Sequence, residues 1–245
     1  MNLALNIPLM SSVKKIKKNI TLIICARCSS KRFPNKVLKK INGIPLILQV
    51  YERVKNSKYV DKVIVATSNR SSDDKLKKLC LQKNIECYRG SLNNVFSRFV
   101  NIIKIHKADI VIRISADSPF IDSRLIDKSI KIFLSKRVDI VTNILKRTYP
   151  KGQSIEVFNK KIFLRSKKLK LTTYEKEHVS PYFYQNKNKY KIFNFHLKND
   201  LSKYNLTIDF REDLLLFNKI IKKIKKSNIY YSYQNILKFI KKNEN

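Results

Sequence analysis

Short runs of β-branched and other apolar residues alternate with longer segments of helical period from Asn19 onward. This alternation restricts the fold more than any other feature of the chain. The runs have the length of strands, whereas the segments between them repeat their apolar residues every three or four positions. Strands that alternate with helices form crossover units on a mostly parallel sheet. The sequence therefore predicts an α/β fold that binds ligands at the carboxyl ends of its strands.

The boundaries of these elements can be read from the same pattern. We expect strands at 20–25, 62–66, a short run ending at 88, 110–114, 139–142, 154–158, 191–196 and 206–209. We expect helices at 46–55, 93–106 and 174–184, a helix opened by the cap residues 71–74, one from about 122, and two Lys-rich helices that close the chain. A turn at 149–152 separates the last third from the rest.

The size of the chain fits one domain. It has 245 residues with 43% hydrophobic content, which is enough to bury a sizeable core. We expect residues 1–18 to form a loose basic extension, because their apolar stretch precedes their lysines, in the reverse order to a signal peptide. No apolar run approaches the roughly 20 residues of a membrane span.

The net charge of +35 comes from lysines spread along the chain rather than from one cluster. A basic chain can bind nucleic acid by releasing phosphate counterions. Dispersed lysine also fits an AT-rich coding bias that fills solvent-facing positions, and nucleic acid is therefore not the favoured partner. The same charge would steer small anions toward an enzyme. Charge alone does not decide between these classes.

The cysteines indicate the compartment. Four of them without a secretory signal predict free thiols and a cytoplasmic location. Cys25 and Cys28 form a C-x-x-C pair, yet no second pair or histidine cluster follows. We interpret both thiols as incidental rather than as a redox pair or half of a zinc site.

The loop after the first expected strand carries four cations within ten residues, which are Arg27, Lys31, Arg32 and Lys36. Backbone amides and hydroxyls at such a strand end can cradle phosphates, and Arg and Lys can neutralise charge that develops during phosphoryl transfer. In so basic a chain a solvated loop explains the same residues equally well. By composition alone both interpretations stay open.

The motifs around this loop favour the phosphate site. Residues 26–36, Ala-Arg-Cys-Ser-Ser-Lys-Arg-Phe-Pro-Asn-Lys, followed by Ile-Asn-Gly-Ile-Pro-Leu at 41–46, resemble the N-terminal signature of the cytidylyltransferases of sugar acids. The resemblance is closest to the spore-coat polysaccharide synthesis protein F group, which is related to enzymes that activate sialic acid and 3-deoxy-manno-octulosonate. It extends over roughly 20–223. Ser29 and Asn35 stand where that family carries glycine.

The resemblance implies a three-layer, mostly parallel α/β sheet of the nucleotide-diphospho-sugar transferase type with a small acceptor-side elaboration. It implies one domain over 19–245, with a nucleotide half at about 19–145 and an acceptor and second-metal half at about 146–245. The catalytic residues implied are Arg27, Arg32 and Lys36. The implied nucleotide-binding residues are Ala26, Ser29, Ser30, Ala66, Thr67, Arg89, Ser91 and Ala116.

Two further segments imply a metal site. Residues 113–122 are similar to the family element R-x-x-G-D-x-P-x-I-D, and residues 206–214 to T-V-D-x-P-E-D-L. By this resemblance Asp117 and Asp209 hold Mg²⁺ against the triphosphate. Each aspartate lies at or just after the end of an expected strand, so the two can meet at one edge of the sheet.

The acceptor side is implied by residues 149–158 and 177–182, which resemble Y-P-K-G-x-D-x-E-V-F and E-H-V-T-P-Y. The residues that would bind the acceptor are Lys151, Glu156, Glu177 and His178. Ser154 replaces the usual aspartate, and this departure bears on the identity of the acceptor.

The implied function is transfer of CMP from CTP to an acidic or related sugar, with release of pyrophosphate, in surface glycan biosynthesis. CTP and the sugar are the expected partners, and we also consider a homodimer. Three alternatives stay open: another nucleotidyltransferase or glycosyltransferase of the same fold, an inactive relative, and a basic RNA-binding module.

Overall fold

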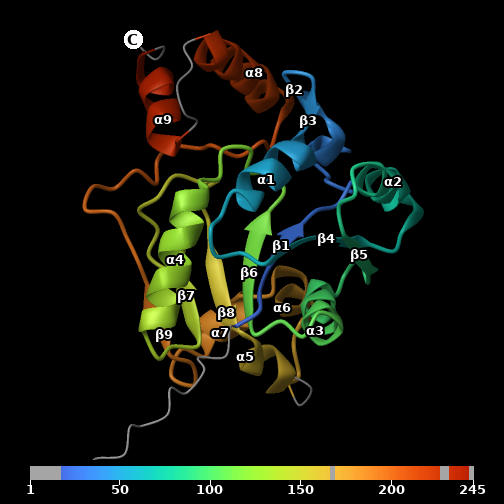
Figure 1. Cartoon of the computed structure of the whole chain (residues 1–245), viewed down its shortest axis with the longest axis vertical. Helices are drawn as coiled ribbons and strands as arrows, with labels where there is room; N and C mark the ends of the chain where they lie inside the picture. Colours follow the sequence, from blue (N-terminus) through green and yellow to red (C-terminus); the bar gives the residue numbers. More distant parts are fainter. Residues whose placement is uncertain (1–17, 166–168, 227–231, 243–245) are drawn as a thin grey trace, which may run out of the picture.

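A seven-stranded sheet with helices on both faces forms the body of the molecule (Figure 1). The structure is a computed structural model that describes residues 18–165, 169–226 and 232–242. It confirms the three-layer, mostly parallel α/β class. Of the expected basic extension at 1–18, all but Lys18 lies outside the described residues.

The strand order of the sheet is β5-β4-β1-β6-β8-β7-β9. Its parallel part contains β1 (Ile20–Cys25), β4 (Lys62–Ser68), β5 (Cys87–Gly90) and β6 (Ile110–Ser115). Beyond β6 follow the antiparallel β8 (Glu156–Asn159), then β7 (Ile140–Thr142) and β9 (Ile192–Asn194). The central strands β1 and β6 are mostly buried because helices cover both faces of the sheet.

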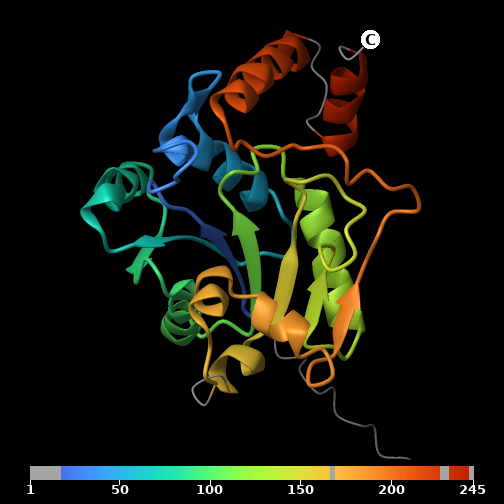
Figure 2. The same cartoon turned by 180° about the vertical axis from the view of Figure 1, so that it is seen from behind.

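Each face of the sheet has its own hydrophobic core. Leu22 and Ile24 of β1 pack on one side and Ile23 on the other, as the alternation of a strand requires. The first side is covered by α1 (Leu46–Lys55), α2 (Asp74–Gln82) and α4 (Ser123–Ser135). The hydrophobic cluster on this side continues into α8 (Arg211–Lys226) and α9 (Tyr233–Lys242). The second carries α3 (Val95–Ile105), α5 (Lys160–Leu164), α6 (Thr173–His178) and α7 (Pro181–Gln185) (Figure 2).

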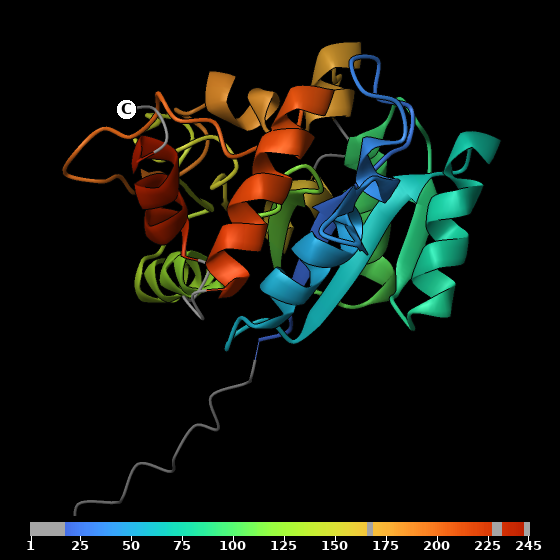
Figure 3. The same cartoon turned by 90° about the horizontal axis from the view of Figure 1, so that it is seen from above.

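The end of the sheet toward which β6 runs is the one that carries α8 and α9 (Figures 1 and 3). A small hairpin of β2 (Lys40–Ile41) and β3 (Ile44–Pro45) lies against α8. Its turn residues Asn42 and Gly43 have φ angles of 47° and 82°, the left-handed pair that a two-residue hairpin needs.

The single helix expected at 174–184 is two helices. Val179 ends α6 with a φ of 69°, and the amide of Ser180 bonds the carbonyl of His178 at 2.8 Å across it. Pro181 then occupies the first turn of α7, where its missing N–H does no harm. Inside one continuous helix its ring would clash with the preceding turn.

The strand expected at 206–209 is also absent. Leu206 donates to the carbonyl of Lys151 and Ile208 to that of Asp117, both at 2.9 Å. These are single bonds to two different segments rather than a ladder with one partner strand. The segment is therefore an extended crossing that ends at Asp209.

Gly152 holds this crossing in place. Its φ is +90°, and a Cβ atom built there would lie 2.7 Å from the carbonyl oxygen of Leu206. We predict that Gly152→Ala lowers the free energy of unfolding by about 2–3 kcal/mol, because strain and a backbone clash add up. Urea denaturation measures this loss.

Gly43→Ala is the matched control, since Gly43 has a φ of +82° but no atom within 4 Å of the added Cβ. It should lose only about 1 kcal/mol, the cost of the left-handed conformation. Equal losses in the two variants would contradict a tight approach of Gly152 to Leu206.

Candidate functional site

A pocket of about 960 Å³ opens at the carboxyl ends of β1 and β6. Residues 26–36, here called the β1 loop, form one wall, and the ends of α6 and of the 206–209 segment form others. The predicted site residues that line the pocket are Ala26, Arg27, Ser29, Ser30, Arg32, Lys36, Ala116, Asp117, Glu177, His178 and Asp209. Segments from both expected halves of the chain thus meet in one cavity.

The ammonium group of Lys36 lies where these segments converge. Its Nζ donates to Asp117 Oδ2 and Asp209 Oδ1, both at 3.0 Å, and to the carbonyl of Ile208 at 2.9 Å. The lysine side chain is only 12% exposed. Asn35, with a φ of 58°, precedes it in the left-handed conformation that a glycine would also adopt.

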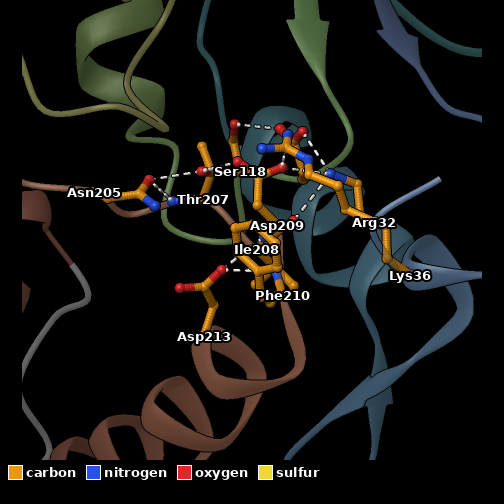
Figure 4. Close-up of polar contacts among 10 residues, drawn as sticks. Arg32, Lys36, Ser118, Asn205, Thr207, Ile208, Asp209, Phe210 and Asp213 are labelled. Carbon is orange, nitrogen blue, oxygen red and sulfur yellow. Dashed lines mark hydrogen bonds and ion pairs between the residues drawn. The ribbon is translucent and has the colours of Figure 1, made fainter. Parts of the chain in front are cut away.

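Asp209 receives a second cation from the β1 loop. Arg32 Nη2 bonds Asp209 Oδ1 at 2.9 Å, and its guanidinium lies over the ring of Phe210 (Figure 4). Burial alone would raise the pKa of Asp209, but the hydrogen bond and charge of Lys36, together with Arg32, lower it. Asp209 therefore stays ionised.

The backbone at Asp209 is held from α8. Asp213 Oδ2 accepts the amides of Asp209 and Phe210, each at 2.8 Å. A carboxylate in the first turn of a helix suits the positive end of its dipole. Asp213 therefore orients the neighbouring Asp209 rather than facing the pocket.

The oxygen atoms around Lys36 match a hard cation. Two carboxylates and one carbonyl converge on a single positive group, and oxygen donors are those that Mg²⁺ and Mn²⁺ prefer. Within the described ranges no cluster of three or more His, Cys, Asp or Glu side chains could hold a metal ion. Any metal at this site would need further ligands from substrate or water.

On the opposite wall, α6 is tied to the β1 loop. Arg27 Nη2 pairs with Glu177 Oε1 at 2.9 Å, and both side chains are partly exposed. His178 follows directly and packs against the ring of Tyr174. The turn at Val179 ends α6 at this point.

Four predicted nucleotide residues lie outside the pocket lining. Ala66 and Thr67 are buried in β4. Arg89 donates to the carbonyl of Ser68 and pairs with Asp74, and Ser91 accepts the amide of Asn94. Their roles toward a nucleotide stay predictions.

Two predicted acceptor residues also lie outside the lining. Lys151 is exposed and forms an isolated bridge with Asn205. Glu156 is buried at 1% exposure and bonds Arg113 and Tyr184.

Several further residues of the lining were not among the predicted site residues. Arg98 is buried and donates to the carbonyls of Ser91 and Leu92, which holds the 91–93 loop at the pocket. Arg113 and Ser115 are two residues apart on β6 and line the floor, and Asp117 follows in the turn after the strand. That period of two was readable in the sequence. The partners of Arg98 were not, because they lie in an irregular loop.

Residues 71–74 were expected to cap a helix, and α2 does begin at Asp74, but the side chain of Asp73 at the N-cap makes no capping bond. It is fully buried and accepts the amide of Cys28 at 2.6 Å and that of Ser68 at 3.1 Å, together with the Ser68 hydroxyl. Burial would raise the pKa of Asp73, and the bonds from Ser68 and Cys28 outweigh it and lower the pKa. Asp73 thereby ties the β1 loop to the end of β4.

We predict that Asp73→Asn destabilises the fold by about 2–4 kcal/mol. Both oxygens of the Asp73 carboxylate accept hydrogen bonds, and in the variant a buried NH₂ group would face one of these donors. Because the pKa of Asp73 is lowered in the folded state, the contribution of its ionised carboxylate to the free energy of unfolding is fully present above the unfolded pKa of about 3.9. It is lost as the pH falls through the folded-state value. Urea unfolding should therefore show a constant gap between wild type and variant from about pH 7 to 5 that narrows below about pH 4.

Asp74→Asn is the control, since Asp74 is an exposed carboxylate one residue away that pairs with Arg89. It should change stability by less than about 1 kcal/mol. A gap for Asp73→Asn that widens in acid would contradict the ionised, hydrogen-bonded state.

Fold and pocket together define the class of protein. The sheet, the basic loop after its first strand and the two facing aspartates belong to the nucleotide-diphospho-sugar transferase fold. A solved cytidylyltransferase from Leptospira borgpetersenii superposes with a TM-score of 0.84 at 30% identity, covering 93% of this chain and 95% of that one.

The family model described as Cytidylyltransferase matches residues 21–238, and the chain belongs to this family of nucleotidyltransferase enzymes. An uncharacterized protein of Methanocaldococcus jannaschii, MJ1063, is 34% identical over 225 residues, 90% of each chain. The spore coat polysaccharide biosynthesis protein SpsF of Bacillus subtilis is 31% identical over 202 residues, 80% of this chain and 83% of its own. The resemblance to the spore-coat group is thereby confirmed. Among the described residues no helix has the length and apolar character to cross a membrane.

Proposed function

We propose that the chain is a cytoplasmic, Mg²⁺-dependent cytidylyltransferase that transfers CMP from CTP to a sugar acid or related sugar, with release of pyrophosphate, in surface glycan biosynthesis. The observation that carries this proposal is the convergence of Arg32 and Lys36 on Asp117 and Asp209 within one pocket. Similarity to a protein named for spore coat polysaccharide biosynthesis supports the glycan role.

Asp117 and Asp209 would hold the metal, since both already face one cation through oxygen atoms. When bound, Mg²⁺ would supply charge neutralisation at the triphosphate. The ammonium of Lys36 would then turn from the carboxylates to phosphate oxygens. Arg27 and Arg32 are more exposed and would bind the same anion from the rim.

The chemistry would rest on positioning and electrostatics. A sugar oxygen attacks the α-phosphorus of CTP, and pyrophosphate leaves on the opposite side. Cations held in a partly water-excluded pocket stabilise the charge that builds up on the phosphate oxygens. No covalent nucleophile is required.

The acceptor would enter beside α6, where Glu177 and His178 line the pocket. Residues 19–245 would act as one catalytic unit, because Lys36 of the nucleotide half bonds Asp209 of the other half. Lys151 and the predicted nucleotide residues of β4 and β5 would act from outside the lining.

The test is pyrophosphate release with CTP, UTP or GTP and a panel of acidic sugars. We expect turnover with CTP and a sugar acid, and a loss of at least about 100-fold in kcat for Asp117→Asn and for Asp209→Asn. Glu212→Gln is the control, because this exposed carboxylate follows Asp209 by three positions outside the pocket. Its kcat should equal that of wild type.

Preference for UTP or GTP would assign the chain to another transferase of the same fold. Salt-dependent RNA binding that survives both aspartate substitutions, without turnover of any nucleotide, would instead support the RNA-binding module.

A further inference from the structure

Arg113 lies on the floor of the pocket and is held from behind by a chain of buried polar groups. It faces Glu156 across the antiparallel pair of β6 and β8, and its Nη1 bonds Glu156 Oε2. The hydroxyl of Tyr184 donates to Glu156 Oε1 at 2.6 Å and lies 3.1 Å from Thr142 Oγ1. Both carboxylate oxygens of Glu156 are thus engaged away from the pocket.

This arrangement keeps the guanidinium charged. Burial alone would lower the pKa of Arg113, but the charge and hydrogen bond of Glu156 raise it. Burial, with Glu156 next, raises the pKa of Tyr184, so that its hydroxyl stays a neutral donor.

Part of the donor capacity of Arg113 is unused. Its Nε is buried and has no hydrogen-bond partner among the described residues. The side chain is nevertheless 25% exposed and belongs to the pocket lining. Leaving a buried donor unpaired is energetically unfavourable. A guanidinium held rigidly in this state is poised to bind an oxygen that enters the pocket.

The depth of Arg113 in the pocket indicates which oxygen that is. Arg113 lies two residues before the end of β6 at Ser115, and Asp117 lies in the turn beyond that end. At about 3.3 Å per strand residue, Arg113 therefore lies roughly 7 Å back along the strand from its end. Cys25 pairs with Ser115 in the sheet and shares this floor. Arg113 therefore lies deeper in the pocket than the group of Lys36, Asp117 and Asp209, and it pairs with Glu156 rather than with either aspartate.

Building on the proposed function, we propose that Arg113 recognises the acceptor sugar at the end remote from the attacking hydroxyl. Its ligand is a hydrogen-bond-accepting oxygen, such as an acyl carbonyl, a hydroxyl or a carboxylate. Glu156 and Tyr184 are positioning residues that aim the guanidinium. The chain should accordingly favour sugar acids long enough to place such an oxygen on Arg113.

The test compares acceptors that differ only in this remote substituent, such as acylated nonulosonic acids and their shortened or deoxy analogues. Arg113→Met alone would leave Glu156 buried without its counter-charge, so the variant is Arg113→Met with Glu156→Gln. We expect at least a tenfold rise in KM for the full-length acceptor, and little change in KM for CTP or for the shortened analogue. Arg137→Met, an exposed arginine outside the pocket, should leave every constant unchanged.

Tyr184→Phe removes only the tyrosine hydroxyl and keeps the ion pair of Arg113 and Glu156. This variant tests the proposal even if the double variant does not fold. We expect it to raise KM for the full-length acceptor by about two- to fivefold while kcat and KM for CTP stay the same. Unchanged acceptor KM in both folded variants overturns the role of Arg113 and leaves the cytidylyltransferase proposal intact. Absence of CTP turnover by the wild type overturns both.

Discussion

The ammonium group of Lys36 is the contact on which the pocket depends. It joins residues 81 and 173 positions away in the chain, and it does so with very little exposure to water. Without it two carboxylates would face each other in a partly buried space, and their repulsion would push the 206–209 segment away from the end of β6. A substrate must replace these same two contacts. A bound cation can pair with the two aspartates and a phosphate with the lysine, in place of the ion pairs that they now form with each other.

The fold was largely predictable from the sequence because it rests on local pattern. Apolar runs such as Ile20–Cys25 and Ile110–Ser115 are long enough and apolar enough to be central strands whatever surrounds them. The convergence of Asp117 and Asp209 was also predictable. The reason given for Asp209 was only partly right, since no strand brings it there and a crossing segment held by Gly152 and Asp213 does.

Two buried carboxylates have partners that the sequence pattern does not show. Asp73 resembles a helix cap in the sequence, yet its partners are an amide 45 positions away and the end of a neighbouring strand. Glu156 lies within a segment similar to an acceptor motif, but the pairing of β6 with β8 turns it toward Arg113. Local patterns specify the backbone; the partner of a buried polar side chain depends on tertiary pairing that no window of sequence contains. Asn35 shows the opposite case, because its left-handed φ supplies locally what a glycine would supply.

The Arg27 and Glu177 pair has a thermodynamic consequence. Under the proposed function, an anion that takes Arg27 would leave Glu177 free, and a sugar that takes Glu177 would leave Arg27 free. The first ligand to bind would have to separate the ion pair, and this reduces its binding free energy. The second ligand would find the pair already separated and bind more tightly, which is positive cooperativity between the two substrates. Since both side chains are partly exposed, the separation costs at most about 1 kcal/mol, so the affinity of the second substrate would rise by no more than about fivefold.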